Sequence, residues 1–251
     1  MPTALITGAS SGIGLELARI FARNGFSLVL VARNGAALQA LAAELKPASV
    51  QVIALDLTLP DAPQQVFNAA PNVDVLVNNA GYSVFGKFAN FPLTDHLNIM
   101  QLNMSALVAL CRLYLPSMLA AGSGRILNVA STAAFQPGPL MAIYYATKAF
   151  VLSFSEALAN ELEGTGVTVT TLCPGPTESG FQARAKMENS GLVKGKKIMD
   201  SRTVAEAGYR ATMAGKTLEI PGFMNKLLAQ SVRVSPRRMM VKVVRALQEE
   251  K

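Results

Sequence analysis

The chain has 251 residues, of which 51% are hydrophobic and 16% are charged. This composition excludes a disordered chain and is sufficient for one large domain with a buried core. The formal net charge is +7, but residues 1–181 carry 8 basic and 10 acidic side chains, whereas residues 182–251 carry 15 basic and 6 acidic ones. We interpret the C-terminal basic excess first as a solvated face, with an anionic substrate or weak association with a membrane surface as alternatives. Nucleic acid binding is not expected, because no stacking aromatic residues alternate with the charges.

Two cysteines, Cys111 and Cys173, lie far apart in the sequence. Their number and spacing indicate neither a disulfide framework nor a metal site, and reduced thiols are typical of a cytoplasmic protein. The first residues lack the basic start and cleavage site of a signal peptide. No run approaches the roughly 18 uninterrupted apolar residues of a membrane span. We therefore expect a cytoplasmic protein without a transmembrane segment.

Short aliphatic runs alternate along the chain with longer stretches of helical periodicity. The predicted strands are Ala4–Thr7, Leu28–Ala32, Val50–Leu55, Val73–Asn78, Arg125–Ala130, Val167–Cys173 and the shorter Thr217–Ile220. The predicted helices cover residues 13–24, 35–46, 61–70, 95–121 and 144–163. Strands that are apolar throughout are buried on both faces, as in a parallel sheet covered by helices. The pattern predicts an α/β fold, a Rossmann-type doubly wound parallel sheet of about seven strands, with ligands beyond the carboxyl ends of the strands.

No linker divides the chain, so residues 1–251 are expected to form a single domain. After Cys173 the sequence becomes more polar, and the segment 181–202 is interpreted either as a mobile substrate lid or as an ordinary surface loop. Thr203 and Glu206 have the spacing of a capping box, which predicts a helix beginning at Thr203. Residues 223–251 are expected to be a C-terminal helical extension, including a helix over 237–250.

A glycine-rich turn follows the first predicted strand and precedes the first helix. Gly8 permits a tight turn, and the absence of Cβ at Gly12 and Gly14 lets the backbone approach a pyrophosphate. The helix N-terminus offers free N–H groups and a partial positive charge to a phosphate. The residues predicted to contact the cofactor from this turn are Gly8, Ser10, Ser11, Gly12, Ile13 and Gly14.

The second strand ends at Ala32 and is followed by Arg33. An NAD site usually has an acidic residue at this position to bind the ribose 2′-hydroxyl. A guanidinium instead suits a 2′-phosphate, so the sequence predicts NADP(H) as cofactor. The ends of the third and fourth strands add further expected cofactor contacts, which are Asp56, Leu57, Asn79, Ala80 and Gly81.

Four polar residues predict acid–base chemistry at the other end of this site. Tyr144 and Lys148 are separated by one helical turn, and an ammonium beside a phenol favours the phenolate, so we expect Lys148 to lower the pKa of Tyr144. Ser131 ends the fifth strand, where its hydroxyl can bond a substrate oxygen. Asn103 is polar among apolar neighbours, and its amide is expected to hold a water against Lys148.

These residues resemble those of the short-chain dehydrogenase/reductase superfamily, in its branch of about 250 residues, over nearly the whole chain. The matching elements are TGASSGIG at 7–14, Asp56, NNAG at 78–81, Asn103, Ser131, YYATK at 144–148 and Pro174-Gly175. The resemblance implies that Asn103, Ser131, Tyr144 and Lys148 are the catalytic tetrad. It also implies that Tyr144, Lys148, Pro174, Gly175, Thr177 and Ser179 lie along the nicotinamide half of the cofactor. Two long helices, 95–121 and 144–163, usually form a subunit interface in this family, so a homodimer or homotetramer is expected.

The expected activity is NADPH-dependent reduction of a carbonyl group or the reverse alcohol oxidation. The substrate contacts are expected from Ala133, Phe135, Met141 and Phe181, with Met187 beyond them, and their apolar character favours an apolar ketone or a 3-oxoacyl substrate. Two alternatives remain open at this stage. One is NADP-dependent oxidation of a small hydroxy compound, and the other is a catalytically idle regulator that senses the cofactor.

Overall fold

The computed structural model describes residues 1–45, 49–185, 187, 190–191, 195 and 198–249. The strands are β1 Thr3–Thr7, β2 Ser27–Ala32, β3 Val50–Ala54, β4 Val75–Asn78, β5 Gly124–Val129, β6 Val167–Leu172, β7 Thr177–Glu178, β8 Met199–Asp200 and β9 Leu218–Glu219. The α-helices are α1 Gly12–Arg23, α2 Gly35–Glu44, α3 Ala62–Ala69, α4 Leu93–Met100, α5 Ala106–Ala121, α6 Ala142–Glu161, α7 Phe181–Ala185, α8 Ser201–Met213, α9 Phe223–Ser231 and α10 Arg237–Gln248. All seven predicted strands are confirmed, each within two residues of its expected ends.

Seven strands form one parallel sheet in the order β3-β2-β1-β4-β5-β6-β9. The chain moves outward from β1 to β3 and then returns to β4 beside β1, so the strand order reverses between β1 and β4. A crevice forms at such a reversal because the helices on either side leave in opposite directions. The predicted doubly wound Rossmann-type fold is therefore confirmed.

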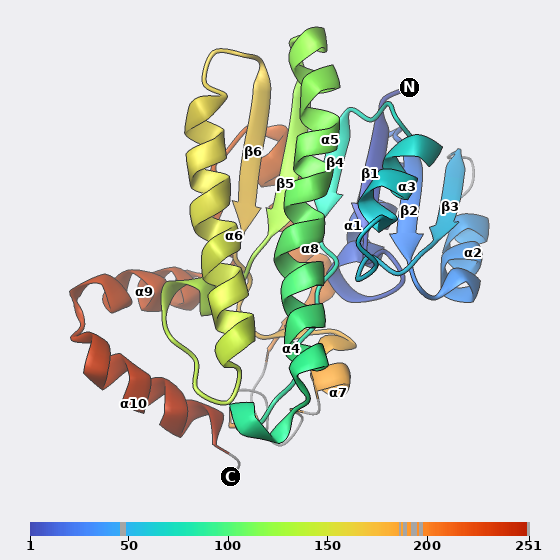
Figure 1. Ribbon diagram of the computed structural model, residues 1–251. Helices are drawn as coiled ribbons and strands as arrows, with labels where there is room; N and C mark the ends of the chain where they lie inside the picture. The colour runs from blue at the N-terminus through green and yellow to red at the C-terminus, as the bar shows by residue number, and fades with distance from the viewer. Residues whose placement is uncertain (46–48, 186, 188–189, 192–194, 196–197, 250–251) are drawn as a thin grey trace.

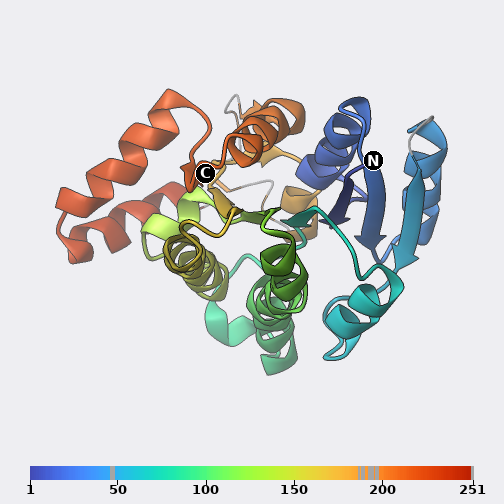
Figure 2. The same cartoon turned by 90° about the horizontal axis from the view of Figure 1, so that it is seen from above.

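The sheet is the middle of three layers, as Figure 2 shows, with α1, α2 and α8 on one side and α3, α5 and α6 on the other. Alternate residues of each strand serve the two layers: Ala4 and Ile6 pack in one hydrophobic core, and Leu5 between them packs in the other. Since both faces of the central strands are covered, the interior positions of β1, β2 and β4 are apolar.

The long predicted helix over 95–121 is interrupted. It consists of α4, a π-helical turn Gln101–Ser105 and α5, which run on without a break in direction (Figure 1). By length and composition, Leu93–Ala121 is one helix of the described chain that is apolar enough to cross a membrane. Leu107, Leu110 and Tyr114 are buried in the core beneath the sheet. One third of the apolar window, 33%, is buried within the described structure.

The helix predicted to begin at Thr203 is present, but the prediction of its N-cap and its first residue is wrong. Helix α8 begins two residues earlier, and Asp200 is its N-cap, accepting a hydrogen bond from the Thr203 backbone N–H at 2.8 Å. Glu206 pairs with Arg202 instead of closing a capping box. The residues DSRT at 200–203 offer two capping side chains, and the small β7–β8 sheet, absent from the sequence prediction, holds Asp200 in the extended conformation that an N-cap needs.

The C-terminal extension is two helices. Helices α9 and α10 form a hairpin that projects from one end of the molecule in both views (Figures 1 and 2). Helix α10 ends at Gln248 and covers most of the predicted 237–250 helix. Of the predicted lid at 181–202, residues 186, 188–189, 192–194 and 196–197 lie outside the described residues.

Candidate active site

One cavity of about 670 Å³ lies beyond the carboxyl ends of the central strands. It extends from the glycine turn after β1 to residues of α6, α7, α9 and α10. The predicted site residues on its wall are Gly8, Ser10, Ser11, Gly12, Ile13, Arg33, Asp56, Leu57, Asn79, Ala80, Gly81, Ser131, Ala133, Met141, Tyr144, Lys148, Pro174, Gly175, Thr177, Ser179 and Phe181. Residues brought together from six strand ends thus meet around one cavity, as the parallel topology requires.

The glycine turn is held by very close packing. Gly8 has φ +67°, and a Cβ there would lie 2.9 Å from the Ala80 Cα. A Cβ on Gly14 would lie 2.4 Å from both the Gly8 carbonyl oxygen and the Asn79 Nδ2. Gly14 therefore packs behind the turn and does not line the cavity, while Gly8, Gly12 and Ile13 do.

The fourth strand fixes this turn through a set of hydrogen bonds. Asn79 donates from Nδ2 to the Thr7 and Gly8 carbonyl oxygens at 2.9 and 3.3 Å. The Thr7 hydroxyl accepts from the backbone N–H groups of Asn79 and Ala80 and donates to Val77. Thr7 was not among the predicted site residues, although it is a buried polar residue at the end of an apolar strand. These hydrogen bonds within the chain therefore hold the glycine turn in its shape.

Arg33 and Asp56 lie at the outer end of the cavity. The side chain of Arg33 is 58% exposed, and its Nη1 lies 3.7 Å from the Asp56 Oδ2. The end of the third strand thus brings a carboxylate beside the guanidinium that is predicted to bind the 2′-phosphate. Asp56 is also held by the backbone N–H and hydroxyl of Thr58, which both donate to its Oδ1 at 2.9 Å. Asn34, the N-cap of α2, lines the same end of the cavity and was not predicted.

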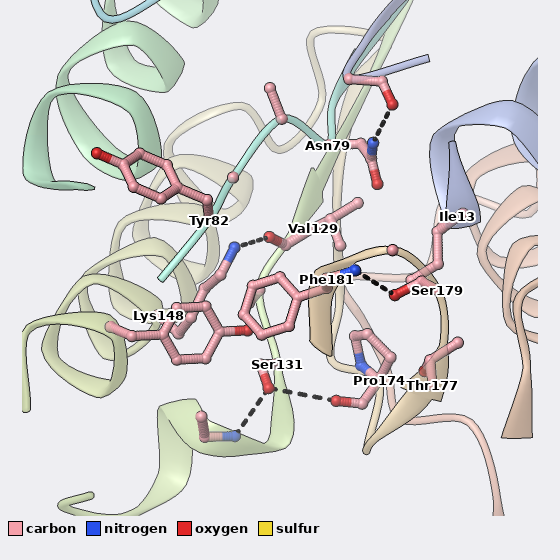
Figure 3. Close-up of a pocket in the computed structure, with 18 of the residues that line it drawn as sticks. Ile13, Asn79, Tyr82, Val129, Ser131, Lys148, Pro174, Thr177, Ser179 and Phe181 are labelled. Carbon is pink, nitrogen blue, oxygen red and sulfur yellow. Dashed lines mark hydrogen bonds between the residues drawn. The ribbon is translucent and has the colours of Figure 1, made fainter. Parts of the chain in front are cut away.

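The inner end of the cavity carries the predicted acid–base residues, shown in Figure 3. Ser131 accepts a hydrogen bond from the Ala133 backbone N–H at 3.1 Å and lies 3.4 Å from the Pro174 carbonyl oxygen. It also hydrogen-bonds the Tyr144 phenol. Lys148 is only 5% exposed, and its Nζ donates to the Val129 carbonyl oxygen at 2.8 Å. The ammonium nitrogen lies 5.7 Å from the centre of the Tyr144 ring.

The pKa values at this end are governed by burial. Burial raises the pKa of Tyr144 above its ordinary value, and the hydrogen bond with Ser131 opposes that shift. Burial lowers the pKa of Lys148 to about 8. The sequence predicted that Lys148 lowers the pKa of Tyr144, but in this structure the opposing influence comes from Ser131. The reason is geometric, because the Lys148 Nζ donates to the Val129 carbonyl oxygen (Figure 3) and lies 5.7 Å from the centre of the Tyr144 ring.

Asn103 lies behind the cavity wall, in the π-helical turn. Its Nδ2 donates to the Tyr82 carbonyl oxygen and the Thr147 hydroxyl at 3.1 Å each, and its Oδ1 accepts from the Tyr82 N–H at 3.2 Å. Both amide hydrogens are therefore used by the protein. A Cβ on Gly81 would lie 3.1 Å from the Asn103 Oδ1 and 3.6 Å from the Lys148 Nζ, so the absence of a side chain at Gly81 leaves space between these two groups.

Four of the residues expected to contact the substrate line the apolar part of the cavity, namely Ala133, Met141, Phe181 and Met187. The ring centres of Phe181 and Tyr144 lie 5.2 Å apart. Phe135 is a correction, because it does not line the cavity. The 3₁₀ helix Thr132–Phe135 turns its side chain toward the hydrophobic core shared with α5 and α6.

The loop after β6 crosses the cavity between its two ends. The Thr177 hydroxyl donates to the Gly175 carbonyl oxygen at 2.9 Å, and Gln182 Nε2 donates to the Thr177 carbonyl oxygen at 2.5 Å. A Cβ on Gly12 would lie 2.9 Å from the Ser179 Cβ, so this loop touches the start of α1. The loop and the glycine turn therefore close around the middle of the cavity together.

The C-terminal hairpin supplies a wall that the sequence did not predict. Asn225, Leu228 and Leu247 line the cavity. Gln248 is fully buried, and its Nε2 donates to the Tyr145 hydroxyl at 2.6 Å. Since Tyr145 adjoins Tyr144 on α6, this bond connects the last turn of α10 to the acid–base residues. The two partners are 103 residues apart, so no local pattern signals their contact.

A doubly wound parallel sheet with a glycine turn at the reversal point and a Ser–Tyr–Lys set beside it defines the class of Rossmann-type oxidoreductases. Comparison with known proteins agrees, since residues 2–190 match the short chain dehydrogenase family. The chain therefore belongs to that family, whose members are oxidoreductases acting on CH–OH and C=O groups.

Individual relatives extend the match to most of the chain. It is 34% identical over 225 residues to the ketoacyl reductase HetN of Nostoc sp., covering 87% of this chain and 77% of the relative. Among solved structures, a short-chain dehydrogenase from Sphingobium yanoikuyae in complex with NADPH has a TM-score of 0.82 at 32% identity, with 95% and 97% of the two chains covered. A bulky-bulky ketone specific alcohol dehydrogenase from Comamonas testosteroni has a TM-score of 0.79 at 31% identity, with 95% and 96% covered.

Proposed function

We propose that this protein is an NADPH-dependent carbonyl reductase, or alcohol dehydrogenase in the reverse direction, that acts on an apolar ketone or a 3-oxoacyl substrate. The observation that carries the proposal is one cavity that joins the glycine turn after β1 to Ser131, Tyr144 and the buried Lys148. Two relatives support the reaction class, because one is named a ketoacyl reductase and another a ketone-specific alcohol dehydrogenase.

The residues present fit a dinucleotide. Gly8 and Gly12 line the cavity without a side chain, and the start of α1 offers backbone N–H groups to a pyrophosphate. Arg33 would bind the 2′-phosphate, and Asp56 would accept from the adenine amino group. The loop residues Thr177 and Ser179 would lie along the nicotinamide half. Neighbours solved with NADPH and with NADP⁺ support the choice of NADP(H).

When bound, NADPH supplies the hydride that reduces the carbonyl carbon. Tyr144 donates its phenolic proton to the carbonyl oxygen, so the carbonyl becomes an alcohol. Ser131 donates a hydrogen bond to the same oxygen and stabilises the charge that develops there. Tyr144 is protonated at neutral pH, so it is in the form that can donate a proton in the reductive direction, although the rise in its pKa by itself makes it a weaker acid.

Lys148 and Asn103 would return the proton to Tyr144. Lys148, with a pKa of about 8, exchanges protons near neutral pH. The Asn103 Oδ1 faces Lys148 across the space left by Gly81 and keeps one lone pair for a water in that space. Asn103 also ties α6, through Thr147, to the loop at Tyr82 and so positions Lys148.

We further propose that the chain acts as a homodimer or homotetramer through α4, α5 and α6. Exposed apolar side chains on these helices support this assembly: they are Leu93, Leu97, Met100, Leu119 and Phe150. A cytoplasmic location, in keeping with two buried free thiols, is part of the same proposal.

The test is consumption of NADPH by the purified protein with a panel of aryl and alkyl ketones and 3-oxoacyl thioesters. The Tyr144→Phe variant should lose about 10²- to 10⁴-fold in kcat, which is the usual contribution of a general acid, and should keep its NADPH affinity. Tyr82→Phe, which changes another phenol on the cavity wall, is the matched control. Full activity in Tyr144→Phe would refute the assignment of the proton donor. NADPH binding without turnover of any carbonyl or alcohol would instead favour the cofactor-sensing regulator.

A further inference from the structure

The C-terminal hairpin, residues 223–248, exposes an unusual amount of apolar surface. Nine of its large apolar side chains are exposed: Phe223, Met224, Leu227, Leu228, Val234, Met239, Val241, Val243 and Leu247. Phe223 is 80% and Leu228 57% exposed. Scattered apolar residues on a surface need no explanation, but a concentration within two short helices marks an interaction site.

Helix α10 divides into three stripes. Met240, Val244 and Gln248 face the body of the protein, since Met240 and Val244 pack with Tyr145 and Gln248 hydrogen-bonds it. Met239, Val243 and Leu247, spaced by four residues, form a second apolar stripe that is exposed within the described part of the chain. Because a separate stripe already docks α10 onto the domain, the exposed stripe has no role in holding the fold.

Basic side chains form the third stripe. Arg238, Lys242 and Arg245 follow one another at helical spacing, and Arg237 precedes them. Arg237, Arg238 and Lys242 pair with no carboxylate among the residues that the structure describes, whereas Arg245 pairs with Glu249. A short helix with an exposed apolar stripe beside an unneutralised basic stripe has the composition of a helix that lies in a membrane interface.

The charge decides between the partners that such a surface fits. A second copy of the chain in a twofold contact would bring the basic stripe near its own counterpart, where like charges repel. An anionic lipid surface attracts the same charges and also receives the apolar side chains. We propose that the C-terminal hairpin binds the surface of a bilayer that contains anionic lipid.

This placement has a consequence for the cavity. Leu228 and Leu247 are half exposed and also line the cavity. The hairpin therefore connects the apolar end of the cavity to the proposed lipid-facing surface. An apolar substrate dissolved in the bilayer would then reach the cavity along side chains of the hairpin. Binding of the bilayer itself does not rest on the proposed reaction.

The test is co-sedimentation of the full chain with vesicles of phosphatidylcholine alone and of phosphatidylcholine mixed with phosphatidylglycerol, at low and high salt. The wild-type protein should sediment with the anionic vesicles at low salt and be released at high salt, because exposed charges are screened. The double variant Arg238→Glu/Lys242→Glu should bind at least tenfold more weakly, since each basic residue near such a surface contributes about 1 kcal/mol. Arg23→Glu/Lys87→Glu, a charge reversal elsewhere on the surface, should bind like the wild type.

A second variant, Phe223→Ser/Leu227→Ser, removes exposed apolar surface and should also weaken binding at least tenfold without changing the thermal melting midpoint. Equal sedimentation of the wild type and both hairpin variants would overturn the proposal, and so would equal binding to the two kinds of vesicle. Analytical ultracentrifugation supplies one more decisive outcome. A wild-type oligomer that dissociates in Phe223→Ser/Leu227→Ser, with no vesicle binding, would assign the hairpin to a second copy of the chain.

Discussion

The two ends of the cavity are built by different means. The outer end is made of backbone, glycines and exposed side chains such as Arg33, and its shape depends on how closely main-chain atoms approach one another. The inner end is made of side chains whose ionisation depends on their surroundings, above all the half-buried Tyr144 and the buried Lys148. Sterics should therefore govern the outer end, whereas pH and side-chain hydrogen bonds should govern the inner one.

The largest predicted effect concerns the inner end of the cavity. Lys148 should make the stability of the protein depend on pH. Its pKa is about 8 in the folded protein, against an ordinary value of 10.5. Between these values the unfolded chain binds the proton and the folded protein does not, so stability rises as pH increases through this window. A shift of this size corresponds to at most about 3 kcal/mol.

Urea unfolding of the wild type and of Lys148→Met at a series of pH values measures this contribution. Burial raises the pKa of Tyr145 and of Cys111 to about 12, which gives an opposite trend above their ordinary values, but this trend is common to both proteins and cancels in the difference. The difference in unfolding free energy should change steadily from pH 8 to 10.5. Lys216→Met, at an exposed lysine, should give a difference that does not vary with pH; the same flat result for Lys148→Met would contradict the buried lysine.

At the outer end, Gly14→Ala should lower the free energy of unfolding by about 1–3 kcal/mol, the range for overpacked sites. The added methyl group would meet both the Gly8 carbonyl oxygen and the Asn79 amide at 2.4 Å. Displacing the turn should also weaken NADPH binding. The control is Gly35→Ala, in the first turn of α2, where the new methyl group meets only the Ala54 Cβ at 3.1 Å. If the two variants had the same free energy of unfolding, the close packing at Gly14 would contribute nothing measurable to stability.

Arg33→Ala should raise the Kd for NADPH by about 10- to 100-fold, as expected for loss of a charged hydrogen bond, and leave the Kd for NADH unchanged. The Asp56 carboxylate, 3.7 Å from the guanidinium, would also lose its neutralising neighbour and repel the 2′-phosphate. Titration by nicotinamide fluorescence measures both constants. Arg23→Ala, at an exposed arginine on α1, should change neither. Equal weakening of the two cofactors would show that Arg33 does not select NADPH.

The smallest effect is expected from Gln248→Leu at the inner end. Loss of the bond to the Tyr145 hydroxyl should cost about 1 kcal/mol of stability. It should also raise KM for the carbonyl substrate several-fold, because α10 would hold the apolar wall less firmly, with no change in the Kd for NADPH. Gln39→Leu, at an exposed glutamine on α2, is the control. A change in NADPH affinity with KM unaltered would reverse the assignment of α10 to the substrate end.

The sequence predicted the outer end better than the inner end for a physical reason. Glycines that follow an apolar strand have few structural alternatives, so Gly8 and Gly12 could be placed on the cavity wall from their position alone. Phe135 could not, because a single 3₁₀ turn decides which way its side chain points. Thr203 failed as a cap because Asp200 competes for the same role.

Contacts between distant parts of the chain were out of reach of local patterns. Two such contacts depend on the completed fold. They are the hydrogen bond between Gln248 and Tyr145 and the hydrogen bond from Asn79 to the glycine turn. The amphipathic character of the 237–250 segment was visible in the sequence. Which of its apolar residues dock and which stay exposed depends on where α10 meets α6.

The π-helical turn at Gln101–Ser105 has an evolutionary implication. Such a turn holds one residue more than an α-helical turn, and each residue of an α-helix advances the chain by about 100°. A single-codon deletion between positions 101 and 105 would restore a regular helix and rotate all of α4 relative to α5. Asn103 would then lose Tyr82 or Thr147, so the other positions of this turn should tolerate changes of side chain far better than changes of length.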